Sequence, residues 1–502
     1  MADEVIGAPG PARPDRAERW RGRIRRHGGF GVVLVLAAGL RAVVQLAYAP
    51  ALFIPDSGSY LAFASRVANG ELTPGGHRVS GYAFALLPYV LGHNLPAIVA
   101  TQHLLGLASG VLIYALLLAR GAHRRLAVLA SVPVLFDPLQ LNVEQYVLAE
   151  TLATFLLLAA VAVLAWPGRW RWRRPVVAGV LLAGATLSRT PDLVVAAPAL
   201  VYVLLACRPW RRAMAYGGAL AGALVVALAV PLAAYTSAAN IDRGGGTVTG
   251  IAQRFLYARL APVADCSRLD LSRAERNLCP TGRPGRRPGP NYYMWSTASP
   301  FLRLRPPAGT STVDVVRGFN RQVLLNQPLS YAGVVAAGYL YGFSPVRGSG
   351  PDRLPSWVYK FQSHYTAWNT SATAISRAYG DTRPMSRPGL QRFLHAYGHF
   401  YVPGPVLGAG LVLGLAAAVG LGPARRSGQR ATSFLFAASA ATVLVPGVAL
   451  SLFSWRYQQP QMSLIPLAAV TGLVALVPRF HRRTAKPVVA VDERPPASPV
   501  AR

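Results

Sequence analysis

Long apolar windows recur along this chain and are separated by short arginine-rich segments. A helix that crosses a bilayer needs about 20 mostly apolar residues, and roughly ten windows meet that criterion. They lie at about 30–49, 97–119, 125–140, 144–166, 175–190, 192–207, 213–236, 403–422, 432–453 and 463–478. The 502 residues are 52% hydrophobic and only 14% charged, which excludes an ordinary water-soluble globule. The pattern predicts an all-α polytopic membrane protein.

The strong positive charge follows the same pattern. A formal net charge of +32 would indicate nucleic acid as the partner of a soluble protein, but here arginine gathers between the apolar windows. Short cytoplasmic loops of membrane proteins carry such clusters, and crossings at every window, with both termini cytoplasmic, put each short basic loop inside. We therefore expect a multi-pass protein of the cell membrane, with membrane lipids and not nucleic acid as partners.

This topology divides the chain into five units. We expect a basic, largely disordered cytoplasmic tail at 1–28, a transmembrane module at 29–236 with a first external loop at 50–96, a large external loop at 237–402, three C-terminal helices within 403–480, and a cytoplasmic tail at 481–502. Residues 328–345 are apolar, yet a crossing there would invert everything downstream. We expect that stretch to lie at the membrane interface or to be buried in protein.

The first external loop opens with an acidic residue and an amphipathic pattern. Apolar side chains between Tyr60 and Ala68 fall on one side of a helical wheel, polar ones fall opposite, and Gly70 can end the helix. Asp56 stands at the start of this predicted helix, close to the headgroup level. Two interpretations remain open for Asp56: it caps the helix, as aspartate often does, or it is a reactive group that meets both a lipid-borne phosphate and a water-soluble partner.

Other ionisable residues lie in or next to the apolar windows, where charge is rare and costly. They are Arg41 in the first window, Glu150 near the outer end of the fourth, and Arg189 with Asp192 at the outer turn between the fifth and sixth. Such groups pair with one another or line a hydrated cavity, and both alternatives stay open for Arg189 and Asp192. Glu144 and Glu150 are about 240° apart on a continuous helix, so we expect only Glu150 to face the site.

Cations and an aromatic residue are predicted on the outer side. His77 and Arg78 lie in GGHRVSGYAFALLP, and Arg456 and Tyr457 lie in SWRYQQPQ just before the last window. Together with an acid on another segment, they suit a phosphate whose lipid tail lies between helices. The alternative for each arginine is a side chain that reaches from a helix end to the membrane surface.

Five motifs, in order and in topology, resemble the GT-C class of membrane glycosyltransferases, of the protein mannosyltransferase and aminoarabinose transferase type. The motifs are PDSGSYLAFA, GGHRVSGYAFALLP, VLAETLATFLL, ATLSRTPDL and RYQQPQMSLIPL. The resemblance covers most of residues 30–210 and the last window. It implies a GT-C-like bundle and transfer of a sugar from a polyprenyl-phosphate donor to an acceptor outside the cytoplasm.

The resemblance also assigns roles to residues. Asp56 matches the family's acid in the first external loop, Glu150 its second acidic position, and His77 or Arg78 the basic residue near the phosphate. Protein mannosyltransferases tend to have Asp-Glu where this chain has Asp56-Ser57, and Pro-Gly-Tyr where it has Ser80-Gly81-Tyr82. These departures leave the acceptor and the donor sugar open.

The proposed transfer chemistry also suits these residues when the family resemblance is left aside. A lipid phosphate is a weakly basic leaving group, so one base is enough, whereas glycoside hydrolysis uses two carboxyl groups. Asp56 would take the acceptor's proton, and a single displacement would invert the anomeric carbon. Rival interpretations are a multi-pass transporter or flippase of lipid-linked glycan, and an envelope polymerase or ligase with a lipid-diphosphate donor.

The remaining reactive residues give weaker patterns. Cys266 and Cys279 share one polar loop and are candidates for a disulfide, whereas Cys207 stands alone. His395 and His399 are four residues apart, but no glutamate completes a metalloprotease motif, so no metal site is predicted. No organic cofactor is implied, and a divalent cation stays open.

Overall fold

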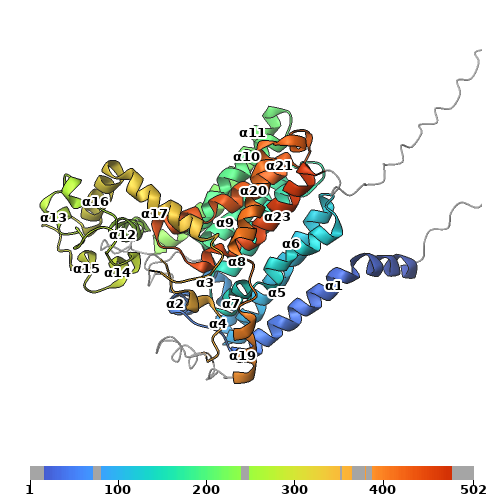
Figure 1. The fold of residues 1–502 in the computed structure, drawn as a ribbon, viewed down its shortest axis with the longest axis horizontal. Helices are drawn as coiled ribbons and strands as arrows, with labels where there is room; N and C mark the ends of the chain where they lie inside the picture. Colours follow the sequence, from blue (N-terminus) through green and yellow to red (C-terminus); the bar gives the residue numbers. More distant parts are fainter. Residues whose placement is uncertain are drawn as a thin grey trace, which may run out of the picture.

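The structure is a computed structural model of the 502-residue chain. It describes residues 16–71, 81–238, 248–350, 353–364, 379 and 387–477. This part of the chain is helical, and its only β-structure is two isolated bridges, Leu52 with Tyr146 and Arg353 with Phe453. Figure 1 shows a bundle of long helices with a smaller group of short helices beside one end. The predicted all-α architecture is confirmed.

Helices occupy each of the ten apolar windows. The N-terminal elements are α1 (Arg16–Ala47), α5 (Leu95–Ala119), α6 (Arg124–Phe136), α7 (Pro138–Gln145), α8 (Glu150–Ala165), α9 (Arg173–Ser188), η1 (Thr190–Val195), α10 (Ala196–Ala206) and α11 (Trp210–Ala238). The C-terminal elements are α20 (Gly404–Val419), η4 (Gly422–Arg426), α21 (Arg430–Thr442), α22 (Val445–Leu450), η5 (Trp455–Gln458) and α23 (Gln459–Leu476). Many of these helices combine high apolarity with exposed apolar faces, as expected where lipid is the solvent.

Five of these helical segments are long and apolar enough to cross a membrane within the described residues. They are His27–Ala47, Leu95–Ala119, Trp210–Ala233, Arg430–Leu450 and Trp455–Leu476. The bent pair α6 and α7 makes a sixth if it is one span, and α8, α10 with η1, and α20 are shorter apolar helices. Length and composition therefore support a polytopic protein, while the number of crossings stays a prediction.

Two local predictions are wrong. The N-terminal tail was expected to be largely disordered to residue 28, but α1 begins at Arg16, because its arginines, alanine and glutamate are good helix formers and continue directly into the apolar span. The fourth window was expected to start a helix near 144. Instead α7 ends at Gln145 and α8 begins at Glu150, so Glu144 and Glu150 belong to different helices.

Glycines let neighbouring helices of the bundle approach closely. A Cβ at Gly179 of α9 would lie 2.5 Å from the backbone oxygen of Leu220 in α11, and one at Gly472 of α23 would lie 2.7 Å from the oxygen of Leu413 in α20. Small residues at such crossings allow the backbone contact that packs helices within a membrane. The two glycines thus let α9 lie close to α11, and α23 close to α20.

A separate group of short helices has its own apolar core, and we call it the outer unit because it lies beside the bundle (Figure 1). It comprises α12 (Val248–Leu260), η2 (Cys266–Arg268), α13 (Arg273–Arg276), α14 (Pro290–Trp295), α15 (Pro300–Arg303) and α16 (Thr312–Asn326). Tyr257, Tyr293 and Phe319 are buried at its centre, with ring centroids of Tyr257 and Phe319 5.4 Å apart. Figure 1 shows this unit on one side of the bundle, and α17 (Pro328–Tyr341) runs from it toward the bundle.

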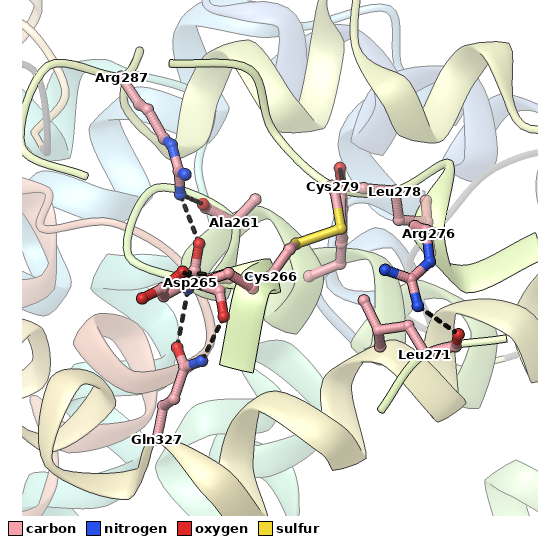
Figure 2. Close-up of a disulfide and its surroundings, with 12 residues drawn as sticks. Ala261, Asp265, Cys266, Leu271, Arg276, Leu278, Cys279, Arg287 and Gln327 are labelled. Carbon is pink, nitrogen blue, oxygen red and sulfur yellow. Dashed lines mark hydrogen bonds between the residues drawn. A yellow bond between two sulfur atoms is a disulfide. The ribbon is translucent and has the colours of Figure 1, made fainter. Parts of the chain in front are cut away.

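The loop after α12 is closed by a disulfide between Cys266 and Cys279, the pair that the sequence proposed. Figure 2 shows Arg287 and Gln327 beside it. Arg287 Nη1 donates to two backbone carbonyls near the end of α12. The Asp265 backbone N–H donates to Gln327 Oε1 at 2.9 Å, and Gln327 Nε2 donates to the Asp265 backbone oxygen at 2.7 Å. These contacts join the loop to the end of α12 and to the end of α16.

The helix α17 packs against the last turn of a candidate membrane span. The Tyr331 hydroxyl donates to the Ala449 oxygen of α22 at 3.1 Å, and Gly338 lies against Val448. None of its residues is buried, and Leu329 and Leu340 are 86% and 67% exposed. Of the two predicted alternatives, burial in protein is therefore wrong, and a place at the membrane interface stays a prediction.

The segment predicted to be the first external loop lies at the end of the bundle nearest the outer unit (Figure 1). It contains α2 (Pro55–Ala68), α3 (Gly81–Ala85) and α4 (Leu87–Leu91). Figure 1 shows these helices with α7 and α19 (Pro388–Tyr397) at the same end. The buried residues of α2 are Ser57, Tyr60, Leu61, Phe63 and Ala64. Gly70 follows the helix with a positive φ of 81°, a conformation that glycine adopts readily at helix ends.

Candidate active site

Asp56 and Arg456 meet at the end of the bundle where α2, α3 and α4 lie (Figure 1). Arg456 Nη1 donates to Asp56 Oδ2 at 2.7 Å. The arginine side chain is only 8% exposed and the aspartate side chain 20% exposed, so the ion pair opens to solvent on the carboxylate side. Asp56 comes from the first turn of α2 and Arg456 from η5, directly before α23. Two of the predicted site residues are thus in contact.

Glu150 lies against the same guanidinium. Its Oε1 is 3.2 Å from Arg456 Nε, and its side chain is 6% exposed. Because α8 begins at Glu150, the carboxylate projects from a helix N-terminus, where negative charge is stabilised. Its second oxygen has no hydrogen-bond partner among the described residues. One arginine therefore holds two carboxylates from different helices, and one buried carboxylate oxygen remains to receive a donor.

The capping interpretation of Asp56 does not fit the geometry. The N-cap position of α2 belongs to Ile54, and Pro55 is the first helical residue. The helix start is secured by the Ser57 hydroxyl, which accepts from the Ile54 backbone N–H at 3.2 Å. Asp56 is then a first-turn residue whose carboxylate contacts Arg456 instead of its own helix end.

The Tyr457 ring links a second cation, Arg189, to the site. The Tyr457 ring lies 5.0 Å from the Arg189 guanidinium and 5.4 Å from that of Arg456. A Cβ at Gly447 would lie 2.7 Å from the Tyr457 ring, so only glycine leaves room for it. Arg189 in turn donates to Asp192 at 2.7 Å, and both side chains are buried. Tyr457 is therefore flanked by two guanidinium groups, a favourable cation–π arrangement.

Burial, together with the carboxylates of the site, raises the pKa of two tyrosines. Burial raises the pKa of Tyr359 in η3 (Ser356–Tyr359), Arg456 lowers it, and Glu150 and Asp56 raise it. Burial also raises the pKa of Tyr82 in α3, with a smaller contribution from Glu150. Both phenols therefore stay neutral at physiological pH. Sequence reasoning did not select Tyr359, because no motif links it to residues so far away along the chain.

The other predicted residues lie elsewhere. Arg41 forms a buried ion pair with Glu144, away from the Arg456 cluster. Pairing is one of the two alternatives predicted for charges in the apolar windows. His77 and Arg78 fall outside the described residues. Of the predicted residues, Asp56, Glu150, Arg456 and Tyr457 thus lie together, with Arg189 and Asp192 beside them.

His395 in the last turn of α19 and His399 just after the helix make backbone contacts. His395 Nδ1 lies 2.8 Å from the Phe361 oxygen, and His399 Nδ1 lies 3.2 Å from the Ala396 oxygen. In the part of the chain that the structure describes, no group of three or more His, Cys, Asp or Glu side chains is arranged to hold a metal ion.

Comparison with protein families supports the resemblance found in the sequence. Residues 78–233 match the family described as Dolichyl-phosphate-mannose-protein mannosyltransferase. This range includes Glu150, Arg189 and Asp192, and leaves out Asp56 and Arg456. The similarity of this part of the chain to GT-C membrane glycosyltransferases is thereby confirmed. A comparison with curated proteins found no match.

Three solved structures show remote similarity. The archaeal oligosaccharyltransferase AglB from Archaeoglobus fulgidus, in complex with an inhibitory peptide and a dolichol-phosphate, is 14% identical with a TM-score of 0.39 and is matched over 90% of this chain and 50% of its own. ArnT from Cupriavidus metallidurans, bound to undecaprenyl phosphate, is 16% identical with a TM-score of 0.35, over 89% and 77%. The Archaeoglobus fulgidus oligosaccharyltransferase tethered to an acceptor peptide is 12% identical with a TM-score of 0.32, over 89% and 56%. The chain thus spans half the length of AglB.

Proposed function

We propose that this chain is an integral membrane glycosyltransferase that transfers a sugar from a polyprenyl-phosphate donor to an extracytoplasmic acceptor. The acceptor is an envelope glycan, a lipid or a protein. The observation that carries the proposal is the shared contact of Asp56 and Glu150 with Arg456 at the outer end of an apolar bundle. The family match over residues 78–233 supports the same activity.

Each residue of the cluster has a chemical role in this proposal. Asp56 accepts the proton of the attacking hydroxyl as general base, because its side chain is the more exposed of the two carboxylates. Arg456 binds the departing phosphate as its negative charge grows. Glu150 contacts the guanidinium at Nε and helps to hold it beside Asp56. The Tyr457 ring supports the Arg456 guanidinium and also contacts that of Arg189.

The reaction balances as a single displacement. The acceptor oxygen forms a bond to the anomeric carbon, the bond from that carbon to the phosphate oxygen breaks, and the acceptor proton passes to Asp56. The bonding electrons leave with the polyprenyl phosphate, a weak base that needs no acid catalyst. Attack from the face opposite the phosphate inverts the anomeric configuration.

The orientation belongs to the proposal as well. With both termini in the cytoplasm, the arginine-rich loops lie inside and the Asp56 cluster lies outside the cell membrane. His77 and Arg78 complete the donor-phosphate site from the first external loop. The units at 1–28, 29–236, 237–402, 403–480 and 481–502 follow from the same topology.

The decisive experiment uses purified full-length protein in lipid nanodiscs, with a panel of undecaprenyl-phosphate sugars and an alcohol acceptor. We expect transfer by the wild type with inverted product stereochemistry, and a loss of at least a hundredfold for Asp56→Asn, since general bases contribute about 10²–10⁴-fold. Asp314→Asn is the matched control, because Asp314 pairs with Arg317 on the exposed surface of α16.

Each alternative predicts a different result. Net retention of configuration would reject the single displacement, and full activity of Asp56→Asn would remove Asp56 as the base. A donor preference for lipid diphosphates would favour a polymerase or ligase. Movement of lipid-linked sugar across the bilayer without transfer would favour a flippase.

A further inference from the structure

A buried ion pair sits at the break between α6 and α7. Arg41 of α1 binds Glu144 of α7 through two contacts, Nε to Oε2 at 2.8 Å and Nη2 to Oε1 at 2.9 Å. The same guanidinium donates to the backbone oxygens of Leu135 and Val134 at 2.8 and 3.0 Å. Pro138 lacks an N–H and leaves the Val134 carbonyl without its helical donor. Arg41 therefore secures the broken helix as well as the carboxylate.

The Glu144 carboxylate is surrounded by donors from three helices. His103 of α5 contacts Oε2 at 2.8 Å through Nδ1, and Gln140 donates to Oε1 at 2.9 Å. The close approach of α5 depends on Gly106, because a Cβ there would lie 2.0 Å from Glu144 Oε1. Since the carboxylate is fully buried and satisfied, its position is fixed from several sides.

His103 extends this network to the neighbouring residue. Its Nε2 lies 3.0 Å from Gln145 Oε1, and the Gln145 amide donates to the Tyr48 oxygen at 3.0 Å. The Gln145 backbone oxygen also accepts from Leu52 N–H at 2.9 Å. Gln145 thus holds the segment that leaves α1 at two points, once through its side chain and once through its backbone.

The contact continues as a short parallel bridge. Leu52 pairs with Tyr146, and Val147 N–H donates back to the Leu52 oxygen at 3.3 Å. Asp56 follows Leu52 by four residues, and Glu150 follows Tyr146 by four residues. Each arm of the bridge therefore leads directly into a helix whose first turn carries one of the two carboxylates held by Arg456.

From this arrangement we infer that His103 and Gln145 are positioning residues for the transfer reaction. They set the register of the Leu52–Tyr146 bridge, and the bridge sets the separation of Asp56 and Glu150 around Arg456. The inference rests on the proposed function for its catalytic consequence. The bridge itself can be observed without any turnover.

The experiment compares Gln145→Met with wild type in nanodiscs, by amide hydrogen exchange and by transfer kinetics. Methionine keeps the length of the side chain and removes both of its polar contacts. We expect faster exchange at the Leu52 and Val147 amides. We also expect a fall in kcat of about tenfold to a hundredfold, since misplacement by about 1 Å can cost 10²-fold, with KM for the donor changed less than about twofold.

Gln461→Met is the matched control, because Gln461 is equally buried and donates to the backbone oxygen of Ala440 at 3.0 Å within the bundle. It should leave the Leu52 amide and kcat unchanged. His103→Asn is the second variant in case Gln145→Met does not fold: asparagine can still reach Glu144 but not Gln145, and the same exchange and kinetic changes are expected.

Three results would overturn the inference. They are unchanged Leu52 exchange in both variants, lost protection with unchanged kcat, and a fall in kcat that Gln461→Met reproduces. If the wild type transfers no sugar, the proposed function fails, and the exchange measurement still decides whether His103 and Gln145 hold the bridge.

Discussion

Arg456 Nη1 lies 2.7 Å from Asp56 Oδ2, although the two residues are 400 positions apart in the chain. The contact joins α2 to η5, the turn that directly precedes α23. Glu150, from the middle of the N-terminal module, completes the cluster at 3.2 Å. The site therefore forms only when the N-terminal and C-terminal parts of the bundle pack together, and neither part contains it alone.

The first prediction concerns Arg456→Lys. A lysine keeps the charge, but its single ammonium cannot occupy the Nη1 and Nε positions that contact Asp56 and Glu150. We expect kcat/KM to fall about tenfold to a hundredfold, which corresponds to the loss of one charged hydrogen bond of about 1.5–3 kcal/mol. Steady-state transfer kinetics with a fixed donor measure this.

Arg268→Lys is the control for that substitution. Arg268 also pairs with an aspartate, Asp265, but the arginine side chain is 80% exposed, and surface pairs contribute little. Wild-type kinetics are expected. If Arg456→Lys behaves like Arg268→Lys, the fork geometry of Arg456 has no part in transfer.

The second prediction concerns the buried Arg41–Glu144 pair. Glu144→Gln removes the anion and leaves the Arg41 guanidinium buried and uncompensated, which costs about 3–5 kcal/mol in comparable pairs. Unfolding in detergent micelles should show this loss, whereas Arg317→Met, which breaks an exposed pair with Asp314, should cost less than about 1 kcal/mol. Equal losses in the two variants would contradict the structural role of the pair.

The helical architecture and several site residues could be predicted because their signals are local. Apolar windows of bilayer length indicate helices wherever they occur. An acid or arginine next to such a window must be paired or functional, whatever the tertiary structure. Asp56, Glu150 and Arg456 satisfied that criterion independently, and the structure brings them together.

The positioning elements could not be predicted, because each depends on a tertiary contact. Leu52 and Tyr146 have no local strand pattern, and their bridge is seen only in the folded chain. Glu144 was set aside by an argument from a continuous helix, but residues 146–149 interrupt that helix. The sequence around His103 does not indicate Glu144 as its partner, because the two residues are 41 positions apart.

The third prediction concerns the disulfide of the outer unit. Cys266 and Cys279 are bonded, and Cys207 is the one free cysteine within the described residues. Thiol labelling of denatured, unreduced protein should therefore modify Cys207 alone, and labelling after reduction should modify all three. Because a disulfide of this kind persists only in an oxidising compartment, the same result from whole cells would support an extracytoplasmic loop. Three labelled thiols without reductant would place the loop on the reducing side.

The last prediction concerns the alkaline limit of stability. Burial raises the pKa of Tyr359 above its ordinary value of about 10. The unfolded chain therefore ionises at this residue near pH 10 while the folded chain does not, so the stability present below pH 10 is lost as the pH rises above it. Tyr359→Phe should reduce the slope of unfolding free energy against pH, between pH 10 and 11.5, by up to one proton, or about 1.4 kcal/mol per pH unit. The difference in unfolding free energy between variant and wild type at pH 7 is the internal control. At that pH the difference reports only the change in packing and the lost contact with Ser454. Parallel curves at alkaline pH would show that the Tyr359 phenol ionises in the folded protein as readily as in the unfolded chain.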